Sequence, residues 1–198
     1  MHHLKSVVSL CAVVAVTACG GGAEGQGEFS TRESALVTGT SQGCTFTVSS
    51  APRQPGPFPY IFDITLTREA SSTCPWSAGS VVVGFSNGTP STVSLAANDL
   101  GVAVSYTYRT GGPSPQQLGI KHVAPETLAI TRSTGLYFNA LGKFIYAGDL
   151  SIEPDGMTLT VSGTKNAPIV GETGSGDDYV ATFPDFFTSE TTPSIVAF

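Results

Sequence analysis

From Cys44 onward, the chain is a succession of short runs in which apolar and polar residues alternate, separated by turn residues. In residues 60–67, for example, Phe62, Ile64 and Leu66 alternate with polar neighbours, the two-residue period of a strand with one buried face. The remaining runs are residues 45–49, 80–85, 91–96, 102–109, 127–131, 143–152, 157–162 and 179–183. These runs predict an all-β fold, a single antiparallel β-sandwich or partly open barrel of about 8–10 short strands.

Two local features refine this expectation. Residues 143–152 and 157–162 are joined by Pro154, Asp155 and Gly156, a turn sequence that predicts a β-hairpin. One or two helical turns are expected at Pro125, because proline suits the first position of a helix.

The charge composition excludes several classes of protein. Charged residues make up 12% of the chain, against about 25% in an average soluble protein, which argues against long surface helices and coiled coils. The net charge of −6 argues against a nucleic-acid partner, since phosphates require a basic face.

The N-terminus reads as a signal peptide. Lys5, together with His2 and His3, makes a short basic start to the chain. A short apolar run follows at residues 7–16, and small residues lie between this run and Cys19. Such a run is too short for an ordinary transmembrane helix, so residues 1–18 are interpreted as a signal peptide.

The residues before the expected cleavage site, Val16-Thr17-Ala18-Cys19, resemble the lipobox of bacterial lipoproteins, with Val16 where leucine is more usual. The resemblance implies that the Cys19 thiol accepts a diacylglyceryl group and that cleavage leaves Cys19 as an acylated first residue, held by several acyl chains such as palmitate. Membrane lipid would then be the partner. Gly20 after the cysteine implies outer-membrane sorting in enteric-type bacteria. The alternative to lipidation is ordinary secretion with cleavage near Cys19.

Cleavage would divide the chain into two further parts. Residues 19–43 are polar and glycine-rich without an apolar period, so they are interpreted as the lipidated cysteine and a flexible tether, with a short strand at residues 35–38 as an alternative. Residues 44–198 form the expected β-sandwich domain. The mature net charge becomes −7, because cleavage removes Lys5 and no acidic residue.

The cysteines predict one disulfide. Cys11 leaves with the signal peptide and Cys19 is the lipid acceptor, so Cys44 and Cys74 remain, and a pair in an oxidising envelope compartment is expected to bond. Two buried free thiols are the alternative. The mature chain has no C-x-x-C spacing and a single histidine, His122, so no metal site and no cofactor are predicted.

No catalytic residues are predicted, although two stretches match a motif of serine hydrolases. Residues 39–43 and 84–88 both match G-x-S-x-G, the second with Ser86 followed by a turn sequence where a nucleophile elbow needs a helix. A triad would have to recruit His122, which is more simply a locally bonded strand or loop residue.

Acidic and aromatic residues leave binding functions open. Asp149, Glu153 and Asp155 lie near one hairpin, and Asp177-Asp178 lies in a glycine-rich loop. These acids could bind Ca²⁺ or act as a pair in glycoside hydrolysis, and the alternative is that they are solvated residues of turns. Trp76 and the pair Tyr106 and Tyr108 could stack on sugars, although core packing explains them more simply.

The sequence therefore predicts a lipid-anchored protein of the bacterial cell envelope with a non-enzymatic β-sandwich that has a structural, adhesive or ligand-binding role. The alternatives are an anchored hydrolase using Ser86 and His122 or acids near Asp149 and Asp155, and a glycan- or Ca²⁺-binding module.

Overall fold

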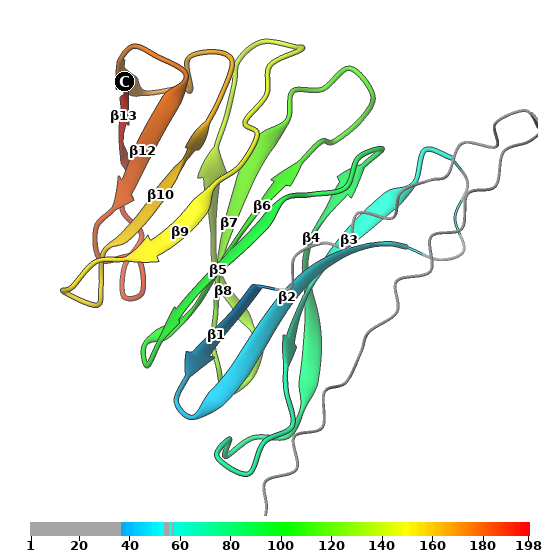
Figure 1. The fold of residues 1–198 in the computed structure, drawn as a ribbon, viewed down its shortest axis with the longest axis vertical. Helices are drawn as coiled ribbons and strands as arrows, with labels where there is room; N and C mark the ends of the chain where they lie inside the picture. The colour runs from blue at the N-terminus through cyan, green and yellow to red at the C-terminus, as the bar shows by residue number, and fades with distance from the viewer. Residues whose placement is uncertain (1–36, 54–55, 57) are drawn as a thin grey trace, which may run out of the picture. The chain divides into compact units, whose positions relative to one another are not determined.

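The computed structural model describes residues 37–53, 56 and 58–198, and these residues form thirteen strands and no helix. The strands build three sheets (Figure 1). None of the described segments is a helix long and apolar enough to span a membrane.

The first two sheets are four-stranded antiparallel meanders, each in sequence order. The first sheet contains β1 (Val37–Ser41), β2 (Cys44–Pro52), β3 (Ile61–Arg68) and β4 (Gly79–Asn87). The second, which we call the middle sheet, contains β5 (Val93–Asn98), β6 (Gly101–Tyr108), β7 (Gln117–Val123) and β8 (Ile130–Leu136).

The third sheet has the order β11-β13-β12-β10-β9 and one parallel pair, β11 with β13. Its strands are β9 (Asp149–Ile152), β10 (Leu159–Thr164), β11 (Glu172–Gly174), β12 (Asp178–Phe183) and β13 (Ser194–Ala197).

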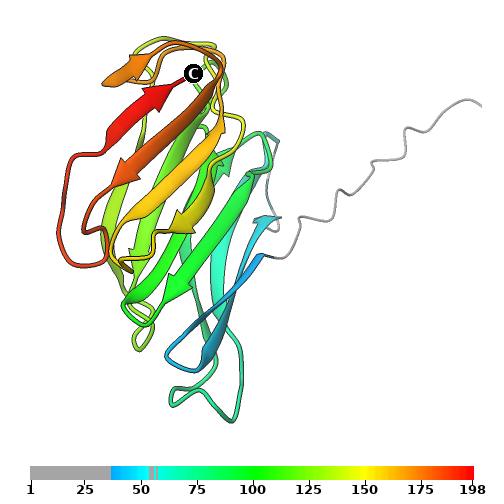
Figure 2. The ribbon, with the colours of Figure 1, turned by 60° about the vertical axis from the view of Figure 1, so that its left-hand side comes forward.

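β6 of the middle sheet is covered on both faces (Figures 1 and 2). Val102 and Val104 of β6 pack into the core shared with the first sheet, whereas Ala103 between them packs into the core shared with the third sheet. All residues of β6 except Tyr108 are therefore buried. The predicted antiparallel β-sandwich is confirmed, with more strands than expected and a third layer that was not anticipated.

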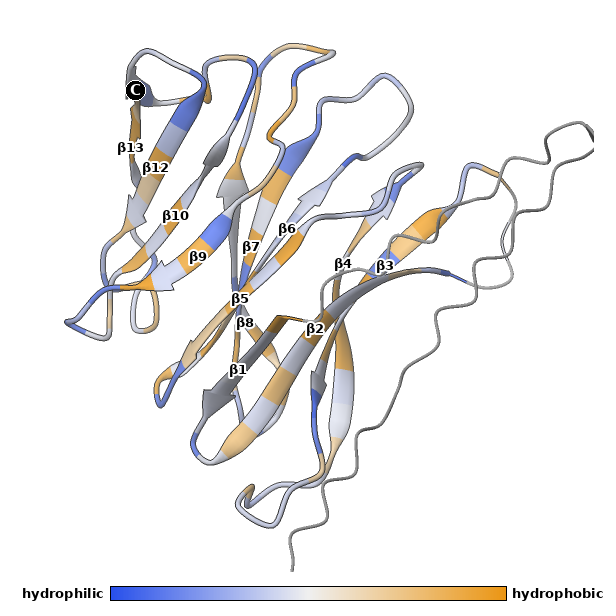
Figure 3. Ribbon diagram, in the orientation of Figure 1, coloured by the Kyte–Doolittle hydropathy of each residue, from blue (hydrophilic) through white to orange (hydrophobic). Residues whose placement is uncertain are grey.

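The predicted alternation is observed in the first sheet. Phe46, Val48, Ile64 and Leu66 are fully buried and point toward the middle sheet, while the residues between them face outward. Figure 3 shows the resulting hydrophobic bands along β2. This period places one apolar face of the sheet in the core.

The predicted hairpin forms between β9 and β10, with Leu159 opposite Ile152. Its first strand is shorter than expected. β9 begins at Asp149, and residues 147–148 interrupt the ladder between β9 and the isolated pairing of Ile145 with Lys165. The helix expected at Pro125 is a single turn, in which the Leu128 N–H donates to the Ala124 carbonyl at 3.0 Å. Leu128 has φ = 60°, a left-handed conformation that ends the turn at once.

The sheet begins earlier than residue 44, in the segment where a short strand at residues 35–38 was the alternative to a tether. β1 pairs with β2 from Val37 onward, so residues 37–43 belong to the domain and not to a tether. Glycine at position 39 makes this possible, since a Cβ there would lie 2.3 Å from Cδ2 of Leu95. The expected signal peptide at residues 1–18, Cys19 and the rest of the expected tether up to residue 36 lie outside the described residues.

A buried ion pair fixes the start of β11. The Lys165 ammonium lies 3.2 Å from Oε1 of Glu172, and the two side chains are 2% and 7% exposed. Lys165 also donates to the Gly176 carbonyl at 2.6 Å, and Oε2 of Glu172 accepts from the Ile169 N–H at 2.8 Å. Each charge is therefore both paired and hydrogen-bonded, as burial requires.

Breaking this pair should destabilise the domain strongly. We expect Glu172→Gln to lower the free energy of unfolding by about 3–5 kcal/mol, because it leaves the Lys165 charge buried and unpaired. Adding Lys165→Met should recover much of the loss. Urea denaturation followed by circular dichroism measures both effects.

The matched control is the exposed pair between Arg53 and Asp63, whose arginine side chain is 51% exposed. Asp63→Asn should leave the urea midpoint nearly unchanged, since solvent screens exposed pairs. Equal effects of Glu172→Gln and Asp63→Asn would show that burial of the first pair has no energetic consequence.

Candidate functional site

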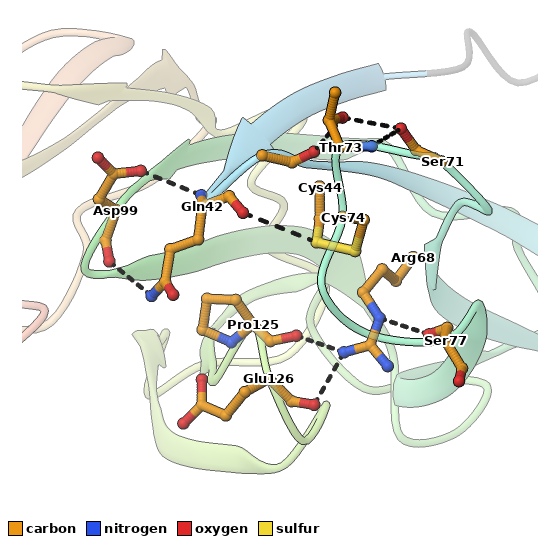
Figure 4. The surroundings of a disulfide bond; sticks show 11 residues. Gln42, Cys44, Arg68, Ser71, Thr73, Cys74, Ser77, Asp99, Pro125 and Glu126 are labelled. Carbon is orange, nitrogen blue, oxygen red and sulfur yellow. Dashed lines mark hydrogen bonds between the residues drawn. A yellow bond between two sulfur atoms is a disulfide. The ribbon is translucent and has the colours of Figure 1, made fainter.

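The predicted disulfide is present between Cys44 and Cys74 (Figure 4). Cys44 begins β2 and is fully buried, and Cys74 lies in the loop between β3 and β4. The same loop is also held by Thr73, whose hydroxyl donates to the Gly43 carbonyl at 2.7 Å. The bond therefore ties the β3–β4 loop to the β1–β2 hairpin.

Arg68 connects this corner to the middle sheet. Its Nε donates to the Ser77 carbonyl at 2.8 Å, and its Nη1 donates to the carbonyls of Pro125 and Glu126 at 2.5 and 2.9 Å (Figure 4). Its guanidinium also lies over the Trp76 ring, 5.7 Å from the centroid. The buried arginine thus has a structural role, and it holds the Pro125 turn against the first sheet.

Loss of the disulfide should cost stability. The cysteines are 30 residues apart, and a loop of that length corresponds to about 3–4 kcal/mol in the chain-entropy description. We expect the variant Cys44→Ala/Cys74→Ala to lose roughly that amount in urea denaturation.

Reduced wild-type protein is the control, and it should unfold at the same urea concentration as the double variant. An unchanged midpoint after either treatment would contradict a stabilising role of the bond.

The structure does not bring Ser86 and His122 together as a catalytic pair. The buried Ser86 hydroxyl accepts from the Arg109 N–H at 3.2 Å, and Nδ1 of His122 lies 2.7 Å from the Thr131 hydroxyl. Ser86 lies in β4 of the first sheet, and the turn sequence after it, Asn87-Gly88, leads to β5 of the middle sheet and not into a helix. In the other G-x-S-x-G match, Ser41 is a buried residue of β1.

His122 is packed as a core residue. Its ring contacts Phe186 and Phe187 edge to face, with centroids 6.0 and 5.4 Å apart, and no described residue forms a hydrogen bond with its Nε2. Burial is the main effect that lowers the pKa of His122 below its usual value, and the Arg132 charge acts in the same direction. The Leu100 backbone and the Glu126 charge oppose it more weakly.

This environment makes stability depend on pH. The native histidine resists protonation, whereas an unfolded histidine takes up a proton near pH 6.5, so the unfolded state gains relative stability as the pH falls below about 6.5. We expect His122→Gln to lose less stability than the wild type between pH 7 and pH 5.5, measured by urea denaturation at each pH.

Thr127→Ala, an exposed change in the neighbouring turn, is the control and should keep the wild-type pH dependence. Identical slopes for His122→Gln and the wild type would exclude His122 as the source.

The predicted acidic sites separate in the structure. Asp155 organises the β9–β10 turn: its carboxylate accepts from the N–H groups of Met157 and Thr158 at 2.9 and 2.8 Å, and the Thr158 hydroxyl and backbone bonds hold its pKa below the usual value. Asp149 lies at the other end of the hairpin and shares a hollow of about 250 Å³ with Asp178. Among the described residues, no group of three or more His, Cys, Asp or Glu side chains could hold a metal ion.

Of the aromatic candidates, Trp76 is half-buried against the core between the first sheet and the middle sheet, and it lies under the Arg68 guanidinium. Tyr106 is buried, and only Tyr108 is partly accessible. The two rings lie 5.8 Å apart at an angle of 50° and do not form a coplanar platform.

Tyr108 nevertheless belongs to a larger polar and aromatic surface on the middle sheet. β4, the last strand of the first sheet, packs over β6, and the outer parts of β7 and β8 remain accessible on the same face. Register places Tyr108 beside Gln117, Tyr106 beside Gly119, and Lys121 beside Ser133. We call this surface the tyrosine face and define it as Tyr106, Tyr108, Gln117, Lys121, Ser133 and Tyr137.

Two glycines let the aromatic rings lie down on the sheet. A Cβ on Gly119 would lie 2.6 Å from Cζ of Tyr106. One on Gly135 would lie 2.3 Å from the Leu118 carbonyl oxygen and 3.2 Å from the hydroxyl oxygen of Tyr137. Gly119 and Gly135 are direct neighbours across β7 and β8. The rings thus cover the positions that side chains would otherwise occupy, a known way to support glycine in a sheet.

The polar groups of the tyrosine face are mainly hydrogen-bond donors. Burial, together with the neighbouring Tyr108 and Tyr137, raises the pKa of Tyr106 to about 12, so its phenol stays neutral. The Tyr108 hydroxyl donates to Oε1 of Gln117 at 2.7 Å, and Lys121 Nζ donates to the Ser133 hydroxyl at 2.8 Å. No acidic side chain in the described part of the chain lies within ion-pair distance of Lys121. Sequence reasoning singled out Tyr106 and Tyr108 but missed Tyr137, Gln117 and Lys121.

A second hollow lies between β8 and the loop that precedes β13. It measures about 330 Å³ and is lined by Arg132, Glu190 and several Ser and Thr hydroxyls. Its two aromatic rings, Phe183 and Phe186, are only 1% and 3% exposed, and Arg132 donates to the Phe186 carbonyl. This hollow therefore offers a ligand little apolar surface.

Comparison with known protein families, with characterised proteins and with solved structures gave no match to this chain.

Proposed function

We propose that the protein is a lipid-anchored protein of the bacterial cell envelope, sorted to the outer membrane, whose folded domain acts by binding and not by catalysis. The disulfide between Cys44 and Cys74 carries the proposal. Such bonds form and persist in oxidising compartments outside the cytoplasm, so the bond supports export. Export in turn supports the interpretation of residues 1–18 as a signal peptide and of Cys19 as the lipid acceptor.

The engagement of the candidate catalytic groups supports the second half of the proposal. Ser86 and His122 are committed to Arg109 and Thr131, and Asp155 is committed to its own turn. These bonds maintain the fold, and a nucleophile or base would need such groups directed toward a shared substrate position. The tyrosine face instead presents the exposed Tyr137 and Ser133 and the half-buried Lys121, which suits binding.

Metabolic labelling tests the anchor. Cells expressing the full chain are grown with an alkyne-bearing palmitate analogue, and the protein is then isolated and coupled to a fluorophore. We expect label on the wild type and none on Cys19→Ser, because the Cys19 thiol is the acyl acceptor.

Cys11→Ser is the matched control, since it removes a cysteine from the expected signal peptide and should leave labelling intact. Label that persists in Cys19→Ser, or absence of label from the wild type, would refute lipidation at this residue.

A further inference from the structure

The tyrosine face contains an aromatic surface of the kind that a sugar ring can cover. Tyr137 is 44% exposed, and its ring lies over Gly135, so one side of the ring is supported by the sheet. The buried Tyr106 ring occupies the neighbouring glycine position, at Gly119. Both glycines of this row, Gly119 and Gly135, are buried beneath the rings, so the surface open to a flat ligand is the outer side of the Tyr137 ring.

Hydrogen-bond donors lie on both sides of this glycine row. Gln117 is two residues before Gly119 on β7, and Lys121 is two residues after it, so alternation places all three on the same face. Lys121 is half-buried, with its pKa lowered by burial, and its one side-chain partner among the described residues is the neutral Ser133 hydroxyl. A half-buried cation without a carboxylate partner is a favourable position for an anionic group of a ligand.

We propose that the tyrosine face binds an acidic polysaccharide, with a uronate ring stacked on Tyr137 and its carboxylate bonded to Lys121. The ring's C–H groups suit the aromatic surface, its hydroxyls suit the Gln117 amide, and its carboxylate complements the one cation of the face. A neutral glycan would leave the Lys121 charge uncompensated, whereas the aromatic surface of Tyr137 and the Gln117 amide suit a sugar ring with hydroxyls better than a phosphate backbone or a lipid headgroup. The proposal does not depend on the lipid anchor.

Affinity electrophoresis tests the proposal. Full-length protein carrying Cys19→Ser is run in native gels containing alginate, a uronate polymer, or dextran, a neutral one. We expect alginate to retard the protein and dextran to leave its mobility unchanged. Tyr137→Ala should weaken the apparent affinity for alginate about fivefold, and Lys121→Gln roughly tenfold or more, while Lys121→Arg should restore most of the latter loss.

Matched controls keep the test specific. Tyr60→Ala removes a tyrosine of similar exposure, 47%, from the loop before β3, and Lys143→Gln removes another partly buried lysine from outside the face. Both should bind alginate like the parent protein, and circular dichroism should show that all variants remain folded.

Three results would overturn the proposal: no retardation by alginate, equal retardation by dextran that survives Lys121→Gln, or losses in the control variants as large as those in Tyr137→Ala and Lys121→Gln. Because Cys19→Ser is present throughout, failure here is independent of failure of the lipid-labelling experiment.

Discussion

The burial of β6, an inner strand of the middle sheet, on both faces is the constraint on which the rest of the structure depends. A strand in this position must supply apolar or small residues in both directions, so β6 cannot alternate as β2 does. The polar side chains that it keeps are neutral and bonded, as when the Ser105 hydroxyl donates to the Gly148 carbonyl. The low fraction of charged residues in the chain follows from this arrangement, since two extended interfaces must be filled without buried charge.

Where charge is buried, it is compensated locally. Lys165 and Glu172 form an ion pair and also hydrogen-bond to backbone groups, and Arg68 donates hydrogen bonds to three backbone carbonyls. Both groups hold loops or strand ends, which gain fewer ladder hydrogen bonds than a long strand. The domain therefore uses its few buried ions to position segments that its sheets hold less well.

Much of the outer architecture was predictable from the sequence, because one-sided strands carry a visible period. Phe62, Ile64 and Leu66 identified β3, and the turn at Asp155 identified the β9–β10 hairpin. The disulfide followed from the two cysteines that remain once Cys11 is assigned to the expected signal peptide and Cys19 to lipidation. The third layer was not predictable, because the apolar run of β6 indicates burial without showing that two different sheets cause it. The tyrosine face needed the register as well, since Gly119, Gly135 and Tyr137 become neighbours only across β7 and β8.

The position of the disulfide has a mechanical consequence. Force applied to the chain N-terminal to Val37 would reach β1 first, and β1 is an edge strand held by β2. Once β1 detached, the load would arrive at Cys44, where the covalent bond to Cys74 diverts it into the β3–β4 loop. The residues between the two cysteines, which include most of β2 and all of β3, would then bear none of the load, and the force would pass on to β4. The bond thus shields these two strands from a pull on the N-terminal side of the domain.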